Sequence, residues 1–143
     1  MPRPLRFALA IIAGIAVALA MLAAVEGFGV WAHPFPAGFG GTHDEICAHV
    51  TRYPAWVLVA VIPAWGAVAW ASTSVGSIVG RGSLAASLVG GPVALAITLN
   101  LWMLPYPWWF RGLAMASVIG GLLIALRKSL RQRASRSVAC QLP

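Results

Sequence analysis

The side chains that can do chemistry lie in one short stretch of the sequence. All three acids and all three histidines fall between residues 26 and 49, and this set comprises Glu26, His33, His43, Asp44, Glu45 and His49. Cys47 adds a thiol to the same stretch. Imidazole, thiolate and carboxylate groups are the ligands that zinc and copper prefer in proteins, so a transition-metal site is one hypothesis.

The spacing of these donors gives the metal hypothesis little support. His43 and Cys47 are four residues apart and would share a helix face, whereas His49 is six residues from His43 and lies further round the helix. The chain has two cysteines, Cys47 and Cys140, and no Cys-x-x-Cys pair. Histidines in a polar loop commonly bind no metal, so we predict no metal ligand and no cofactor.

The residues around the histidines predict a short helix on the membrane surface. Thr42 and Glu45 form a Thr-x-x-Glu capping box, which starts a helix, and Pro54 bounds it at the other end. The expected helix covers residues 43–53 and places Glu45 beside His49. An interfacial helix of this kind would turn its acids and histidines toward water.

Glu26 indicates a site because it lies inside an apolar run. It precedes Trp31 by five residues, which places it about 7 Å deeper than the interface that Trp31 marks. Asn100 precedes Pro105 by five residues and lies at a similar depth. An ionisable group at that depth is costly unless it is paired or hydrated. The candidate polar or ion-binding site therefore comprises Glu26, His33, His43, His49 and Asn100.

Two interpretations of the Glu26 and Asn100 pair stay open. The two side chains can meet across the bundle as a structural hydrogen bond, worth about 1 kcal/mol, that fixes which helices are neighbours. Alternatively, they form a proton- or cation-linked site that opens outward.

Composition shows what kind of fold must hold these residues. Of the 143 residues, 60% are hydrophobic and 9% are charged, and the mean hydropathy is +0.85. A soluble domain carries roughly a quarter charged residues. A water-soluble fold of this length could not bury so much apolar surface. We therefore predict one integral membrane domain, residues 1–143.

Four apolar runs each approach the ~20 residues that a membrane-spanning helix needs. They are continuously apolar rather than alternating, which favours helices over strands. The prediction is an all-α, polytopic transmembrane four-helix bundle with a short interfacial helix in its first extracytoplasmic loop. Its expected segments are helices 7–31, 55–79, 84–104 and 112–126, the outer loop 32–54 and a basic tail 127–143. A secretory signal is the alternative for the first run, but its 19 apolar residues exceed the about 7–15 of a signal core.

The basic residues predict the orientation. With both termini on one side, that side holds eight of the ten Lys and Arg residues: Arg3, Arg6, Arg81, Arg127, Lys128, Arg131, Arg133 and Arg136. The opposite side holds Arg52 and Arg111. Because basic residues concentrate in cytoplasmic segments, we expect both termini in the cytoplasm and the protein in the inner membrane. We expect these basic residues to contact the lipid bilayer, and we expect no nucleic-acid partner.

Small residues four apart recur in every span and predict close helix packing. The stripes are Ala10, Gly14 and Ala18; Ser72, Gly76 and Gly80; Ala86, Gly90 and Ala94; and Gly112, Ala116 and Gly120. Such stripes form seams either within one chain or between copies.

The sequence favours a non-enzymatic role. The serines of residues 72–87 lie toward the cytoplasmic side, away from every histidine, and no phosphate-binding glycine loop occurs. We expect a small membrane subunit, assembly factor or scaffold, with a membrane protein partner or a homo-oligomer. A proton- or cation-coupled transporter that uses Glu26 and Asn100 is the alternative.

Three stretches resemble a group of small bacterial four-span proteins: His33-Pro34-Phe35-Pro36, Arg52-Tyr53-Pro54-Ala55-Trp56, and Asn100 to Pro107. The resemblance covers most of residues 26–110. That group has no assigned activity, so the resemblance implies no catalytic or binding roles. Small multidrug transporters also have four short helices with a glutamate in the first, but Glu26 lies near the outer end of its span. Four-span glutathione-type membrane enzymes are similar in shape, yet no glutathione-binding motif is present.

Overall fold

The computed structural model describes residues 1–139, and this part of the chain contains helices and no strand. The helices are α1 (Arg3–Ala32), α2 (His43–Val50), α3 (Ala55–Gly80), α4 (Ser83–Met103) and α5 (Trp108–Ala139). Four of them, all except α2, are long and apolar enough to cross a membrane. The predicted all-α four-span bundle is thereby confirmed.

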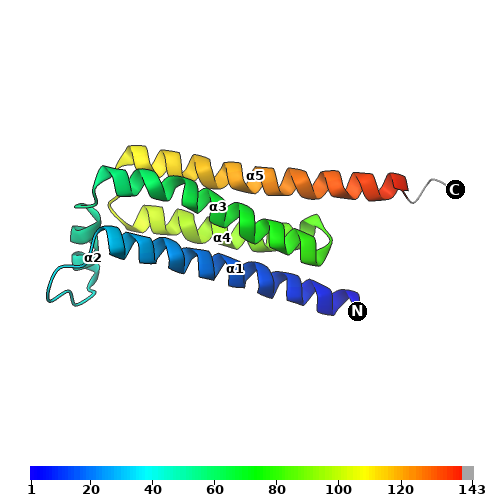
Figure 1. Ribbon diagram of the computed structural model, residues 1–143, viewed down its shortest axis with the longest axis horizontal. Coiled ribbons are helices and arrows are strands. Elements are labelled where there is room, and N and C mark those ends of the chain that lie inside the picture. Colours follow the sequence, from blue (N-terminus) through cyan, green and yellow to red (C-terminus); the bar gives the residue numbers. More distant parts are fainter. Residues whose placement is uncertain (140–143) are drawn as a thin grey trace.

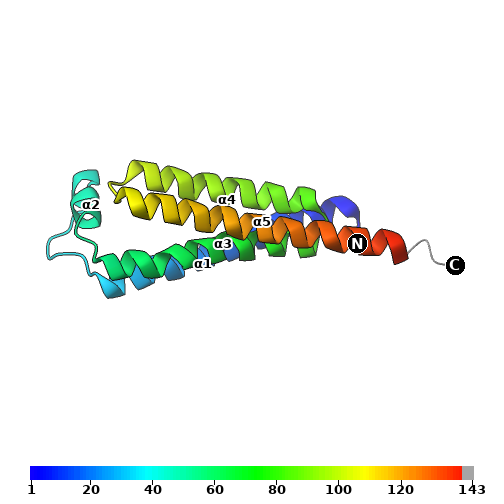
Figure 2. The same ribbon diagram turned by 90° about the horizontal axis from the view of Figure 1, so that it is seen from above.

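Helix α3 lies at the centre of the bundle. It packs against α1, α4 and α5, whereas α1 and α5 lie on either side of it and do not pack together within the described residues (Figure 1). Helix α2 crosses one end of the bundle, which we call the α2 end (Figure 2). The start of α1, the last turns of α5 and the turn between α3 and α4 lie at the opposite end, which we call the basic end.

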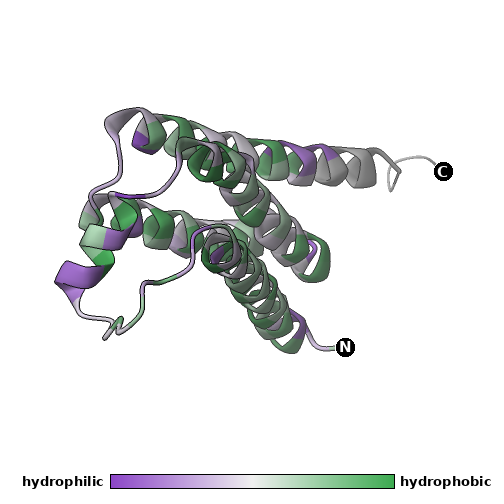
Figure 3. Cartoon of the chain, turned by 60° about the vertical axis from the view of Figure 1, so that its left-hand side comes forward, coloured by the Kyte–Doolittle hydropathy of each residue, from purple (hydrophilic) through white to green (hydrophobic). Residues whose placement is uncertain are grey.

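Hydropathy follows this layout. Figure 3 shows hydrophobic residues along the four long helices and hydrophilic residues gathered in α2 and toward the chain ends. The expected outer loop 32–54 forms the α2 end, and α2 inside it ends at Val50, three residues before the predicted limit.

Helix α5 is longer than the predicted fourth span at both of its ends. It begins at Trp108, directly after Pro107, and continues to Ala139, so the first part of the expected basic tail extends the same helix. Residues 122–139 contain no glycine or proline and are rich in Leu, Ala and Arg, which favour helix. Residues 140–143 of the expected tail lie outside the described part.

Glycines allow the helices to approach closely. A methyl group on Gly121 in α5 would collide with the carbonyl oxygen of Gly66 in α3. A methyl group on Gly14 in α1 would meet the Val89 side chain of α4 at 2.7 Å. Trp65, Leu101 and Phe110 are buried in the core that these contacts enclose, which is made by α1, α3, α4 and α5.

Candidate functional site

The predicted capping box starts α2. The Thr42 hydroxyl oxygen accepts a bond from the Glu45 N–H at 3.4 Å. The Glu45 carboxylate in turn accepts bonds from the Thr42 N–H at 3.0 Å and the Gly40 N–H at 3.1 Å. Of these groups the Thr42 N–H does most to lower the pKa of Glu45 below its ordinary value. Glu45 is therefore bound to the start of its helix rather than to His49.

His43 and Cys47 meet on α2, as their spacing predicts. The Cys47 sulfur lies 3.5 Å from Nε2 of His43. His43 is exposed and Cys47 is half-buried, so this pair lies at the surface of the α2 end.

His49 is buried, and the expectation that the histidines of α2 face water is wrong for this residue. Its ring stacks on His33 with the centroids 4.4 Å apart, and Phe35 packs against it at 4.6 Å. The segment after α1 folds back against α2 and covers His49 with its aromatic side chains. In the described part of the chain, the Nε2 atoms of His33 and His49 are buried and have no hydrogen-bond partner.

The surroundings of His49 in this stack hold its pKa below the ordinary value. Burial lowers the pKa of His49 most, and the positive charges of His33 and Arg52 lower it further. Two imidazolium rings stacked at this distance would repel each other. Protonation of His49 therefore weakens its contact with His33.

Tyr53 connects the histidine pair to the neighbourhood of Glu26. Its ring centroid lies 5.0 Å from that of His33 and 5.3 Å from that of His49. Its hydroxyl approaches Gly29 of α1 so closely that a methyl group there would lie 3.2 Å from it. Gly29 is three residues after Glu26 on the same helix.

Glu26, Tyr53 and Tyr106 line one small cavity between α1, α3 and the start of α5. Its volume of about 30 Å³ is close to the volume that one water occupies in the liquid. Trp65 and Phe110 line the cavity from the core. Burial raises the pKa of Tyr53 and of Tyr106, and the Glu26 carboxylate raises both further. Both phenols therefore keep their protons at neutral pH and can donate hydrogen bonds.

Asn100 is not among the residues that line this cavity. Its Oδ1 is buried and has no hydrogen-bond partner within the part of the chain that the structure describes. The Arg111 guanidinium donates to the Leu104 carbonyl at 2.8 Å. Glu26 is exposed at the surface of the bundle, and it shares the lining of this cavity with Tyr53 and Tyr106. Asn100 and Arg111 do not line the cavity.

Tyr53 and Tyr106 were not among the residues predicted for the candidate site, because tyrosine near the end of a span is commonly an interfacial anchor. The one available signal was that prolines flank both residues, Pro54 after the first and Pro105 before the second. Prolines only mark where the chain turns at the helix ends and do not specify which helix these rings approach.

The possible metal donors form two separate pairs, His43 with Cys47 and His33 with His49. Among the described residues, no group of three His, Cys, Asp or Glu side chains lies close enough together to hold a metal ion.

No protein-family model, curated protein or solved structure matches this chain. The resemblance to small bacterial four-span proteins therefore stays a prediction, and function has to be argued from the geometry.

Proposed function

We propose that the protein is a small multi-pass subunit or assembly factor of a bacterial inner membrane and acts by binding a transmembrane helix of another membrane protein. Both termini lie in the cytoplasm in this proposal, because the basic residues concentrate at the end of the bundle that carries the termini.

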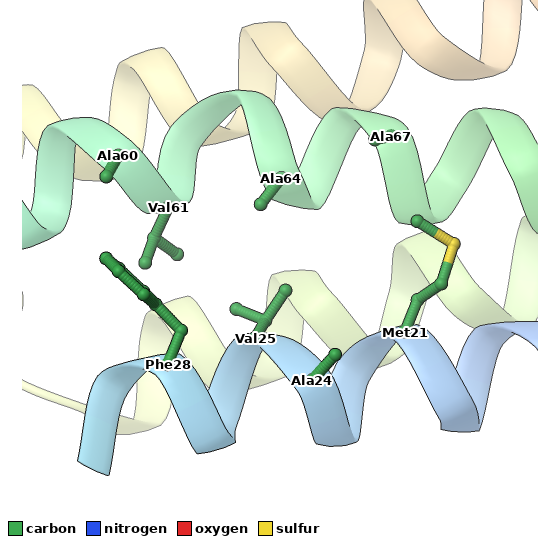
Figure 4. A pocket seen from close by; sticks show the side chains of 8 residues that line it. All are labelled: Met21, Ala24, Val25, Phe28, Ala60, Val61, Ala64 and Ala67. Carbon is green, nitrogen blue, oxygen red and sulfur yellow. The ribbon is translucent and has the colours of Figure 1, made fainter. Parts of the chain in front are cut away.

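An open groove between α1 and α3 carries the proposal. Figure 4 shows the groove from close by, and its volume is about 410 Å³. Eight apolar residues line it, four of them alanine: Met21, Ala24, Val25, Phe28, Ala60, Val61, Ala64 and Ala67. Helix association in lipid depends on close packing, which small residues permit. A groove of this composition therefore suits the side of another helix.

Helix α1 is the span that the chain itself covers least. Only 17% of its most apolar window is buried, compared with 28% to 39% for the other three spans. The spacing of Ala60, Ala64 and Ala67 places three small side chains along one face of α3 opposite α1. An incoming helix could approach the α3 backbone closely along this face.

The proposed occupant of the groove is a helix of a different membrane protein, and capture of a second copy of this chain is one outcome of the test below.

Site-specific photo-crosslinking in native membranes tests the proposal. A photoreactive residue at Ala64 is expected to capture one membrane protein, with the crosslinked peptide mapping to a transmembrane segment. Leu95 of α4 is the matched control, because it is exposed and lies at a similar distance from the α2 end of its helix. Equal capture at both positions, capture of a second copy, or no protein captured at Ala64 would contradict the proposal.

A proton- or cation-linked activity is a second candidate, and the cavity beside Glu26 favours it. Two protonated phenols border that cavity together with Glu26, and Tyr53 extends the polar cluster to His33 and His49. The substitution Glu26→Gln keeps the side-chain shape and removes the charge. It is expected to abolish a proton- or cation-dependent flux in vesicles, whereas Asn100→Ala should leave that flux in place. An unchanged flux in Glu26→Gln would contradict this candidate.

A further inference from the structure

The basic end of the bundle holds a cavity that the proposed function does not use. It lies between the first turn of α1, the turn joining α3 to α4 and the first turn of α4, and its volume is about 420 Å³. That volume falls within the about 300–1,000 Å³ range of small-molecule sites. Arg3, Arg6 and Arg81 all line it. Three positive side chains from two separate elements therefore border one space.

No acidic side chain of the chain is available to these arginines. The three acids are Glu26 near the other end of α1, and Asp44 and Glu45 in α2. A guanidinium stays charged at every physiological pH and its fork of N–H groups matches the oxygens of phosphate. Within residues 1–139 no carboxylate lies near these arginines, so we look for a complementary anion outside this part of the chain.

Two helix N-termini add to the positive potential of the cavity. Helix α1 starts at Arg3 after Pro2, and α4 starts at Ser83 after Gly82, and neither start has a side-chain cap. The first N–H groups of a helix lack intrahelical partners and its dipole favours anions there. Leu84 in the first turn of α4 also lines the cavity.

At this turn the backbones of α1, α3 and α4 approach one another closely. A methyl group on Gly80 would collide with Ala85 of α4 and lie 3.2 Å from Ala10 of α1. Arg81 follows with φ of 54° and ψ of 34°, the left-handed conformation in which glycine is the usual residue after a helix. Arg81 therefore occupies a position whose backbone conformation favours glycine, and it lines the cavity.

We propose that this cavity binds a phosphate-bearing anion, with Arg3, Arg6 and Arg81 as its ligands. A phosphate monoester offers up to two negative charges and three acceptor oxygens to the three guanidinium groups. In a membrane-spanning bundle the cavity lies at the level of the lipid headgroups. The phosphate therefore comes from a phospholipid headgroup or from a soluble phosphate compound.

The full chain in nanodiscs separates the two sources. Two probes are used, phosphatidic acid mixed into phosphatidylcholine discs and inorganic pyrophosphate added to pure phosphatidylcholine discs, and binding is read by thermal unfolding and native mass spectrometry. Retention of phosphatidic acid alone supports a headgroup ligand, and stabilisation by pyrophosphate supports a soluble one. The absence of both overturns the proposal.

Substitutions assign the effect to the cavity. Each change of Arg3, Arg6 or Arg81 to Gln is expected to weaken binding about fivefold, and the triple variant about a hundredfold. The control is Arg127→Gln with Lys128→Gln, which removes two exposed charges of α5 that do not line the cavity. If the control weakens binding as much as the triple variant, the effect is general surface attraction and the proposal fails.

Arg81→Gly separates binding from folding. Glycine relieves the left-handed backbone conformation, so this variant is expected to unfold at the same or a higher temperature than the wild type. It also removes one guanidinium, so its affinity for the probe should fall about fivefold, as in Arg81→Gln. Wild-type affinity in a stably folded Arg81→Gly protein would overturn the role of this residue.

Discussion

His33 and His49 stack with their ring centroids 4.4 Å apart and their planes inclined by 21°. The first histidine follows α1 and the second belongs to α2, so the contact joins α2 to the bundle. Because His49 is buried, the stability of this contact depends on its ring staying neutral.

The stack predicts that α2 loosens in mild acid. The pKa of His49 lies below its ordinary value of 6.5, so the unfolded segment binds a proton at a pH where the folded one does not. Stability is therefore complete above pH 6.5 and falls as the pH drops toward the lowered pKa, with a slope of at most about 1.4 kcal/mol per pH unit. Hydrogen exchange of the α2 amides, corrected for the intrinsic rate, measures this loss.

His49→Phe keeps an aromatic ring in the stack and removes the titration. It should flatten the dependence on pH between 6.5 and 4.5, above the range in which Glu45 titrates, because the pKa of Glu45 is lowered from 4.5. The control His43→Gln alters an exposed histidine and should keep the wild-type profile. An unchanged profile in His49→Phe would show that another group is responsible.

The capping box makes a separate prediction about α2. Thr42→Ala removes the hydroxyl that accepts the Glu45 N–H and should destabilise the helix by about 1 kcal/mol. Local opening would then increase about fivefold, which the alkylation rate of Cys47 measures in a Cys140→Ser background. Thr51→Ala is the matched control, since its hydroxyl bonds to the Ala48 carbonyl at the other end of the helix. Equal alkylation rates in Thr42→Ala and the parent protein would contradict the prediction.

Two adjacent glycines of α5 test how α3 and α5 pack. Gly121→Ala should destabilise the protein by about 1–3 kcal/mol, because its methyl group would collide with the Gly66 carbonyl oxygen. Gly120→Ala places the same methyl group where no atom lies within 4 Å. Thermal unfolding in detergent should show a lower midpoint for the first variant only. Equal midpoints would mean that the two helices are not in close contact at Gly66.

The spans were predictable because a continuous apolar run of about 20 residues has one favourable state in a membrane protein. The start of α2 was predictable as well, because the capping box of Thr42 and Glu45 depends on local spacing alone. These features require no knowledge of how distant segments meet.

The packing face of each span was harder to predict. The spans are apolar on every side, so the sequence pattern does not distinguish the face that packs against other helices from the face that meets lipid. Ala10, Gly14 and Ala18 are buried, as the first stripe predicts. Gly112 and Gly120 of the fourth stripe instead have nothing within 4 Å, and form no seam within the described part of the chain. Gly121, next in sequence, makes the close contact.

The surroundings of Glu26 and His49 depend on long-range folding. His49 is buried because the segment after α1 returns over α2, and Tyr106 reaches the cavity beside Glu26 from the turn between α4 and α5. No local pattern encodes either contact. Spacing from Trp31 and Pro105 predicts the depths of Glu26 and Asn100 but not their neighbours.

Filling the groove between α1 and α3 tests the central claim most directly. Ala64→Phe places a large side chain among Val25, Val61 and Phe28 at the surface of the groove, and Leu95→Phe adds a similar ring on an exposed face of α4. Both proteins should keep the wild-type unfolding midpoint. Crosslinking from a photoreactive residue at Ala24 should then lose its membrane protein partner in Ala64→Phe and retain it in Leu95→Phe. An unchanged partner in a folded Ala64→Phe protein would show that no transmembrane helix binds in this groove.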